Sequence, residues 1–289
     1  MLRTVLAAVL LLQMSAATFD ASRAFEHLRQ LVALGPRPAG SPAIAKARTY
    51  IKTQLVAAGI AVSEQPWVAR TPIGPLPMVN LIASVPGASL DRVVIAGHYD
   101  TKRFNEFRFV GANDGGSSAA FLIELARVLK ARSNPLTIEL LFLDGEEAVV
   151  EWREEDHTYG SRHYVADAKR RGSLASLKAM ILVDMIGDRD LRLKRDLNST
   201  PWLVDVIWAT ARARNQPAFH PDVIEIEDDH LPFIAAGVPA VDLIDFEFPA
   251  WHGAGDTLDA VSADSLQVVA DVLIAALPEI EARLARTGR

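Results

Sequence analysis

The spacing of apolar residues changes along the chain. In some stretches they recur every three or four positions, which is typical of helices with one buried face; elsewhere they form short continuous runs, which are typical of strands buried on both faces. Helices are expected over residues 20–34, 42–58, 160–169, 201–214, 232–236 and 262–277, with a further helix beginning at Gly115. Strands are expected over residues 79–85, 92–97, 136–143, 177–183 and 238–244. Because strands and helices alternate from residue 79 onward, the pattern predicts a three-layer α/β/α sandwich around a mostly parallel central sheet.

The first residues, MLRTVLAAVLLLQMSAATFD, depart from this alternation. Basic Arg3, an apolar stretch over residues 5–12 and small residues up to Ala17 follow the order of a secretory signal peptide. The apolar stretch is too short to span a bilayer, so cleavage is expected rather than anchoring; an N-terminal helix of the fold is the alternative. We therefore expect a signal peptide over residues 1–17, a single catalytic α/β domain over residues 18–289, and a secreted or periplasmic protein without a membrane anchor.

Composition excludes several classes of protein. The chain has no cysteine, which excludes disulfides, thiolate metal sites and a cysteine nucleophile, and suits an exported bacterial protein. The net charge is −6 and no run of Lys or Arg stands out, so no nucleic-acid partner is expected. We expect a monomer, because no large apolar surface helix stands out.

Polar residues follow the expected strands at the rim where sites gather in α/β sheets. Six stretches each supply His, Asp or Glu there: His98 with Asp100, Asp114, Glu146 with Glu147, Asp184, Asp228 with Asp229 and His230, and His252 after Trp251. Each alone has an ordinary explanation as a helix cap, a buried structural histidine or a turn residue. Together, in a chain without cysteine, mixed histidine and carboxylate groups favour zinc. Asp100 is spaced to orient the imidazole of His98.

Glu146 and Glu147 stand side by side after a strand that should be buried, where two like charges repel. A bound dication would neutralise one of these carboxylates by coordinating it. Its neighbour could then act as a general base beside the metal. Gly145 allows the backbone to turn at this point. The pair therefore predicts one metal ligand and one base.

Several motifs carry a family resemblance from about residue 79 to residue 260. GHYDTK, FVGANDGGSSAAFLIELAR, LLFLDGEEA, YGSRHY, ILVDMIG, DDHLPFIAAGVPAVDLI and the WH pair resemble the zinc-dependent aminopeptidase superfamily with the M28-like fold. The lysine of GHYDTK, the tryptophan of DGEEAVVEW, the EDDHLPF stretch and Trp251 before His252 resemble, more narrowly, the glutaminyl-peptide cyclotransferases.

The resemblance implies an activity and a set of residue roles. One zinc would be held by Asp114, Glu147 and His252, and Glu146 would be the catalytic acid and base. Asp184 and Asp228 would hydrogen-bond around Glu146. Trp152, Trp251 and Phe248 would form the apolar walls of the pocket, with Lys102 near it. His98 and Asp184 would stand at a possible second-metal position. The substrates would be peptides or proteins with an N-terminal glutamine, cyclised to pyroglutamate with release of ammonia.

Some stretches of the sequence differ from the animal cyclotransferases, and these differences leave two other functions open. ANDGGSS is closer to the aminopeptidase version, residue 242 is Asp where the animal enzymes carry His, the FEFPAWH segment is shorter, and no Cys pair is present. An M28-type aminopeptidase with two zinc ions is therefore the alternative, since every residue it needs is present. A binding domain that has lost catalysis is the other rival, against which the intact Glu146, Glu147 and His252 weigh.

Overall fold

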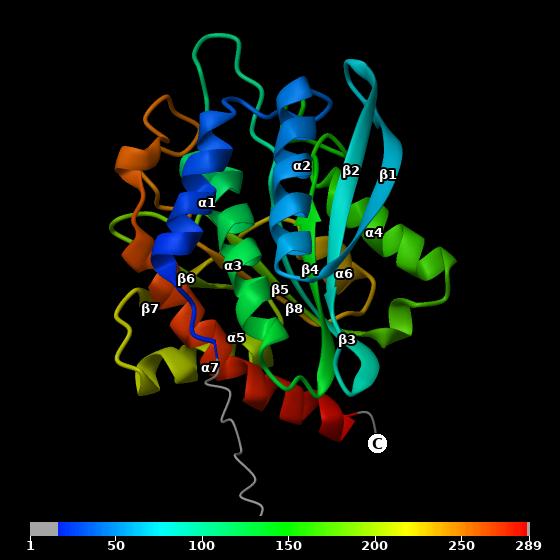
Figure 1. Ribbon diagram of the computed structural model, residues 1–289, viewed down its shortest axis with the longest axis vertical. Helices are drawn as coiled ribbons and strands as arrows, with labels where there is room; N and C mark the ends of the chain where they lie inside the picture. The colour runs from blue at the N-terminus through cyan, green and yellow to red at the C-terminus, as the bar shows by residue number, and fades with distance from the viewer. Residues whose placement is uncertain (1–16, 288–289) are drawn as a thin grey trace, which may run out of the picture.

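The computed structural model describes residues 17–287, and the predicted signal peptide falls almost wholly outside the described residues. A six-stranded sheet forms the centre of the fold in the order β1-β2-β4-β3-β5-β8 (Figure 1). Its strands are β1 (Ala61–Thr71), β2 (Gly74–Val85), β3 (Ser89–His98), β4 (Leu136–Leu143), β5 (Leu177–Asp184) and β8 (Ala240–Ile244). The pairs β3–β4, β3–β5 and β5–β8 are parallel, whereas β1–β2 and β2–β4 are antiparallel. The prediction of a mostly parallel sheet is confirmed.

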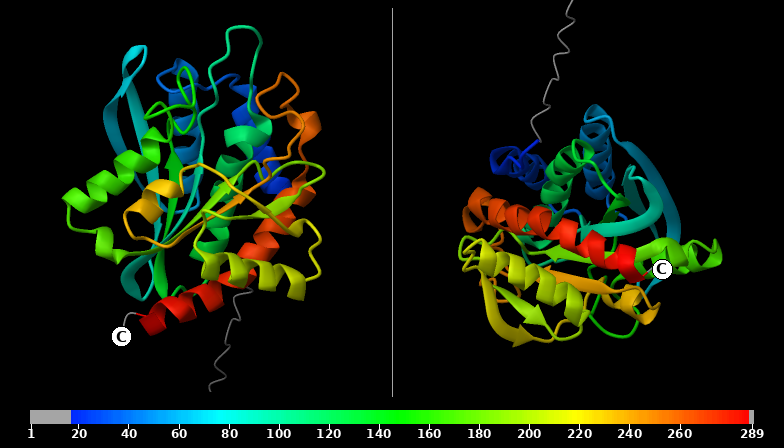
Figure 2. Two further views of the ribbon diagram at one scale, coloured as in Figure 1. Left: turned by 180° about the vertical axis from the view of Figure 1, so that it is seen from behind. Right: turned by 90° about the horizontal axis from the view of Figure 1, so that it is seen from below.

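Helices cover both faces of this sheet. The helices α1 (Ala21–Ala33), α2 (Pro42–Ala57) and α3 (Ser118–Lys130) lie in front of it in Figure 1, together with α7 (Ala263–Thr287), against which α5 (Pro201–Ala213) packs. The helices α4 (Tyr159–Arg170) and α6 (Leu231–Ala235) lie on the opposite face, seen from behind in Figure 2. Alternate strand residues divide between two cores: Ile95 packs with the first group of helices and Val94 with the second. This is the three-layer sandwich that the alternation predicted.

Three strands of the structure were not predicted from the sequence. The first, β1, is an edge strand with largely exposed or half-exposed residues, so it carries no apolar run. The other two, β6 (Leu193–Asp196) and β7 (Phe219–Ile224), form a separate short parallel pair. Pro278 neither ends nor restarts the last helix, because α7 continues through it to Thr287. Among the described residues, no helix is both long enough and apolar enough to cross a membrane.

The helix expected from Gly115 begins at Ser118 instead, and this correction matters for the site. An irregular turn, Ala112–Ser117, precedes α3, with Asp114 extended and Gly115 at φ +76°. A Cβ at Gly115 would lie 2.3 Å from the carbonyl oxygen of Asp100 and 2.9 Å from Cε1 of His98. Only glycine combines this backbone angle with so close an approach. The turn therefore sets Asp114 apart from the helix, facing the sheet edge.

Candidate metal centre and active site

The carboxyl ends of neighbouring parallel strands bring the candidate residues together. His98 ends β3 and pairs in register with Leu143, the last residue of β4, so Glu146 follows within one short turn of it. Asp184 ends β5, on the other side of β3. Asp114 reaches the same edge from the turn before α3. The expected convergence on one rim of the sheet is therefore present.

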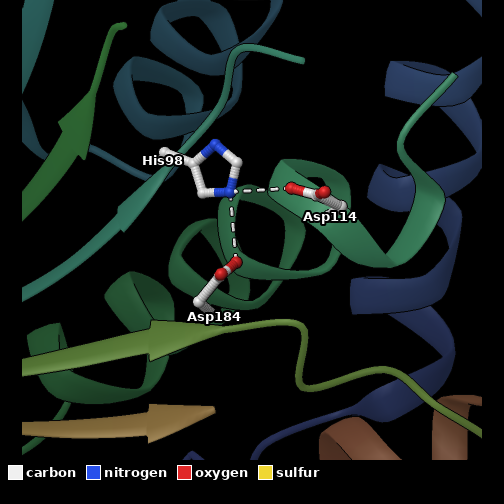
Figure 3. A group of neighbouring side chains, drawn as sticks. All are labelled: His98, Asp114 and Asp184. Carbon is white, nitrogen blue, oxygen red and sulfur yellow. Dashed lines mark hydrogen bonds and ion pairs between the residues drawn. The ribbon is translucent and has the colours of Figure 1, made fainter. Parts of the chain in front are cut away.

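Two groups of side chains at this rim have the geometry of metal ligands, and they share Asp114. In the first group, one ligand atom from each of Asp114, Glu147 and His252 lies within 4.8 Å of the others. Nε2 of His252 is 3.3 Å from Oε1 of Glu147 and 3.4 Å from Oδ2 of Asp114. In the second group, Nε2 of His98 is 3.2 Å from Oδ1 of Asp114 and 3.1 Å from Oδ1 of Asp184 (Figure 3).

The first group fits a zinc ion. Imidazole nitrogen and carboxylate oxygen are zinc ligands, and three protein ligands with one open position are typical of catalytic zinc sites. Oδ2 of Asp114 is buried and has no hydrogen-bond partner among the described residues. A buried acceptor without a donor is costly, and a cation between Asp114, Glu147 and His252 would satisfy it.

The pKa values of the adjacent glutamates are driven apart by their surroundings. Burial raises the pKa of Glu147, but a hydrogen bond with His252 and the charges of His252 and Lys102 outweigh it, so the pKa is lowered overall. Burial raises the pKa of Glu146 well above its usual value; His98 opposes this, while Asp228 and Glu147 add to it. Burial and the charge of Glu147 raise the pKa of Asp114 to about 7. Glu147 is thus held as an anion, and Glu146 is disposed to take up a proton.

These side chains line one pocket of about 470 Å³. The sequence-predicted residues in its lining are Lys102, Asp114, Glu146, Glu147, Trp152, Asp184, Asp228, Trp251 and His252. His98 lies beneath it, with Nδ1 3.4 Å from Oδ1 of Asp100, as the spacing of these two residues predicted. Nζ of Lys102 is 3.6 Å from Oε2 of Glu147.

The structure corrects the predicted position of the Phe248 side chain. It was expected as a wall of the pocket, but its side chain is turned inward and packs with Met185, Ile226 and Ile244. Phe246 lines the pocket instead. The segment after β8 is irregular, so the side of the chain on which each phenylalanine falls depends on the turn and cannot be read from the sequence.

Ring stacks hold the two tryptophans of the pocket. Trp251 stacks on His252 with ring centres 4.3 Å apart, and the ring centre of Phe246 lies 4.8 Å from that of Trp251. Trp152 stacks on His157 with ring centres 4.2 Å apart. His252 itself has a positive φ of 51°, which is uncommon outside glycine and clusters at functional sites.

Known proteins match the chain over most of its length. The model of peptidase family M28 matches residues 80–277. The glutaminyl-peptide cyclotransferase of Bothrops jararaca is 30% identical over 94% of this chain and 85% of its own. The crystal structure of Acidobacteriales bacterium glutaminyl cyclase is 40% identical, covers 98% of this chain and 100% of its own, and superposes with a TM-score of 0.88.

The chain belongs to the glutaminyl-peptide cyclotransferases of peptidase family M28. The family resemblance drawn from the motifs is confirmed. A relative from Mus musculus, named glutaminyl-peptide cyclotransferase-like protein, is 32% identical over 76% of this chain, which spans 66% of that relative's length.

This member of the cyclotransferase family also has supporting carboxylates that were not predicted. Asp256 accepts hydrogen bonds from the backbone N–H groups of Asn113 and Asp114, at 2.7 and 3.1 Å, and so fixes the turn that carries Asp114. Its position four residues after His252 was visible in the sequence, but nothing in the sequence said what it would contact. Asp156 is a second such residue, in the loop after Glu147.

A further polar cluster lies behind the pocket. His230 is fully buried, with Nε2 3.1 Å from Oδ2 of Asp196 and Nδ1 3.8 Å from Oδ2 of Asp242. Burial raises the pKa of Asp242 well above its usual value, and the charge of Asp228 adds to this. Asp242, noted in the sequence only as a departure from the animal enzymes, is thus part of the acidic surroundings of Asp228.

Proposed function

We propose that this chain is a zinc-dependent enzyme that cyclises N-terminal glutaminyl peptides to pyroglutamyl peptides and releases ammonia. The observation that carries the proposal is the pairing of Glu146, whose pKa is raised, with the Asp114–Glu147–His252 ligand set in one pocket walled by two tryptophans. The names of the Bothrops jararaca and Acidobacteriales relatives support the same reaction.

In this reaction the α-amine of the glutamine attacks its own side-chain amide carbon. The new N–C bond closes a five-membered lactam, and the bond from that carbon to the amide nitrogen breaks. When bound by Asp114, Glu147 and His252, zinc supplies Lewis-acid polarisation of the amide oxygen. The free α-amine is the nucleophile; Glu146 takes one proton from this nitrogen as it attacks and gives that proton to the departing amide nitrogen, so the products are the lactam with one N–H and neutral ammonia.

The acidic neighbours of Glu146 prepare it for this role. Burial raises the pKa of Glu146 and the charge of Asp228 adds to this, which makes its carboxylate a stronger base near neutral pH. Asp184 accepts hydrogen bonds from the backbone N–H of Met185 at 2.8 Å and from the hydroxyl of Ser118 at 3.4 Å, which hold it facing His98. We assign Asp184 and Asp228 to positioning the proton that Glu146 carries.

The walls of the pocket favour ring closure over hydrolysis. Trp152 and Trp251 cover the site and exclude water from the amide carbon, while the intramolecular amine stays in place. Lys102 keeps Glu147 ionised for metal binding. The chain's own contribution is thus to fold the glutamine side chain back, keep water out and move one proton.

Mass spectrometry of a glutamine-initiated peptide, with and without a chelator, tests the proposal. Loss of one ammonia from an intact peptide, abolished by the chelator and restored by zinc, is the expected result. Release of the first residue as a free amino acid would overturn it in favour of an aminopeptidase.

The second candidate function is that M28-type aminopeptidase, favoured by the His98–Asp114–Asp184 group, which could hold a second ion. We propose one zinc per chain, because the unpartnered Oδ2 of Asp114 belongs to the first group, whereas in the second group Nε2 of His98 already contacts Oδ1 of Asp114 at 3.2 Å and Oδ1 of Asp184 at 3.1 Å. Metal analysis of the purified protein that finds two tightly bound ions would contradict this count.

We also propose that the chain is exported and acts as a monomer. The signal-like order of residues 1–17 supports export. Cell fractionation with N-terminal sequencing of the mature protein tests the first point, with cleavage near Ala17 as the expected result. Light scattering of the purified protein tests the second.

A further inference from the structure

The loop that joins β4 to α4 carries Glu147 at its start and Trp152 at its tip. Two backbone hydrogen bonds close its base: the N–H of Thr158 donates to the carbonyl of Glu146 at 2.7 Å, and the N–H of Tyr159 donates to the carbonyl of Gly145 at 2.8 Å. It is a compact loop whose ends meet, of the kind that often serves function.

Packing into the core does not hold residues 150 and 151 of this loop. Val150 is 59% exposed, and Glu151 is exposed as well. Two residues that are not glycine, Glu154 and Thr158, adopt positive φ angles of 54° and 47°. Such a backbone persists only where surrounding contacts over-determine it. Some other interaction must therefore fix the segment that leads into Trp152.

The buried carboxylate of Asp156 supplies that interaction. Its Oδ1 accepts the N–H of Val149 at 3.1 Å and the hydroxyl of Tyr159 at 2.7 Å. Its Oδ2 accepts the N–H groups of Val150 at 2.9 Å and Glu151 at 3.0 Å. Burial raises the pKa of Asp156, but these four donors outweigh it and lower the pKa overall, so the group is an anion.

We propose that Asp156 is a positioning residue: its carboxylate holds residues 149–151 and thereby sets Trp152 at the wall of the substrate pocket. This inference deepens the proposed function and rests on it, since Trp152 is taken to cover the bound glutamine. Asp156 and Trp152 are also joined through His157, which follows Asp156 and carries the ring on which Trp152 stacks. The carboxylate and the stack together fix both sides of the loop tip.

A double-mutant cycle between Asp156 and Trp152 tests the proposal. Asp156→Asn leaves one acceptor oxygen and turns an NH₂ group toward donors that were satisfied. Because small misplacements of a positioning group are costly, kcat/KM for a glutamine-initiated peptide should fall about tenfold, mostly through KM, with zinc content unchanged. In a Trp152→Ala background the same change should cost less than about twofold, since contacting residues are non-additive. Equal cost in both backgrounds, or no cost in the first, would overturn the proposal.

A control variant and a second test variant complete the kinetic experiment. Asp20→Asn alters a carboxylate that likewise accepts backbone N–H bonds, at the start of α1 away from the pocket, and should leave kcat/KM unchanged. If Asp156→Asn does not fold, Tyr159→Phe removes one donor only and should raise KM by a smaller factor; an unchanged KM would refute the proposal.

Hydrogen exchange measures the protection of the loop's backbone amides independently of enzyme activity. The backbone amides of residues 149–151 should be protected in the wild type and exchange freely in Asp156→Asn. Unchanged protection would contradict the role of the carboxylate, even in a protein that cyclises glutamine. Loss of protection in a protein that cyclises nothing would instead count against the proposed function alone.

Discussion

Oε1 of Glu147 lies 3.3 Å from Nε2 of His252, although 105 residues separate them along the chain. One comes from the loop after β4 and the other from the loop after β8. Their contact shows that the two loops close over the same point at the sheet edge, with Asp114 completing the group.

His252→Ala should therefore remove the zinc as well as the activity. Even the hydrogen-bond partners of metal ligands cost about 10–100-fold in affinity when lost, so removal of a ligand should cost more. Metal analysis and the cyclisation assay measure the two effects. His98→Ala is the matched variant, and with a single zinc it should keep the metal. If the wild type held two ions and His98→Ala lost one of them, the one-metal assignment would be contradicted.

Glu146→Gln should abolish proton transfer and leave the zinc in place. The expected loss of kcat is about 10²–10⁴-fold, the usual contribution of a general acid–base group. Glu151→Gln, an exposed carboxylate lining the same pocket, serves as the control and should change kcat little. If Glu146→Gln retained wild-type kcat, another residue would have to carry the proton.

Trp251→Ala should weaken substrate binding, because this side chain lines the pocket and is still 42% exposed. Loss of its stacking should raise KM roughly three- to tenfold, the range of an aromatic pair. Trp202→Ala, on α5 and away from the pocket, is the control for general loss of a tryptophan. Equal KM values for Trp251→Ala and the wild type would argue against a wall at this position.

Gly115→Ala should damage the turn before α3 far more than an ordinary glycine substitution. The new Cβ would meet the carbonyl of Asp100 at 2.3 Å, at a backbone angle that disfavours alanine. Strained backbone conformations cost about 1–3 kcal/mol each, and the clash adds to this. Gly237→Ala is the matched control, since φ is +82° there but nothing lies within 4 Å. Thermal unfolding and zinc content measure the difference; similar melting temperatures for the two variants would contradict the clash.

Stability should fall as the pH rises through about 6, in part because of Asp245. Burial raises its pKa to about 6; backbone N–H bonds from Arg192 and Glu247 oppose this, and the charge of Asp188 adds to it. In the unfolded chain the value is about 3.9, so the folded state binds this proton more tightly. The stabilisation is then fully present below about pH 4 and is lost as the pH rises through about 6.

Asp245→Asn should flatten this dependence. Its melting temperature should fall less than that of the wild type between about pH 4 and pH 6, the window set by the two pKa values. Asp205→Asn, an exposed carboxylate on α5, should leave the slope unchanged. A wild-type slope in Asp245→Asn would show that other groups cause the dependence.

Local pattern was enough to predict most of the core. All residues of β4 and β5 are buried except one half-buried residue in each, so the bounds of these apolar runs were found to within a residue. The edge strand β1 and the short pair β6–β7 were missed, because strands that are partly exposed carry no continuous apolar run. Gly115 was expected to begin a helix. The structure shows instead that it has a positive φ and lies against the carbonyl of Asp100, a residue to which the local pattern does not connect it.

The sequence by itself determined the sandwich, the rim at which the polar residues gather and the family. Tertiary structure alone decided which side chains meet: Phe246 rather than Phe248 lines the pocket, and Asp156 holds the loop of Trp152. The physical reason is one of range. Periodicity records which face of a segment is buried, whereas the direction of a side chain in a loop is set by hydrogen bonds and stacks with residues that the pattern does not connect.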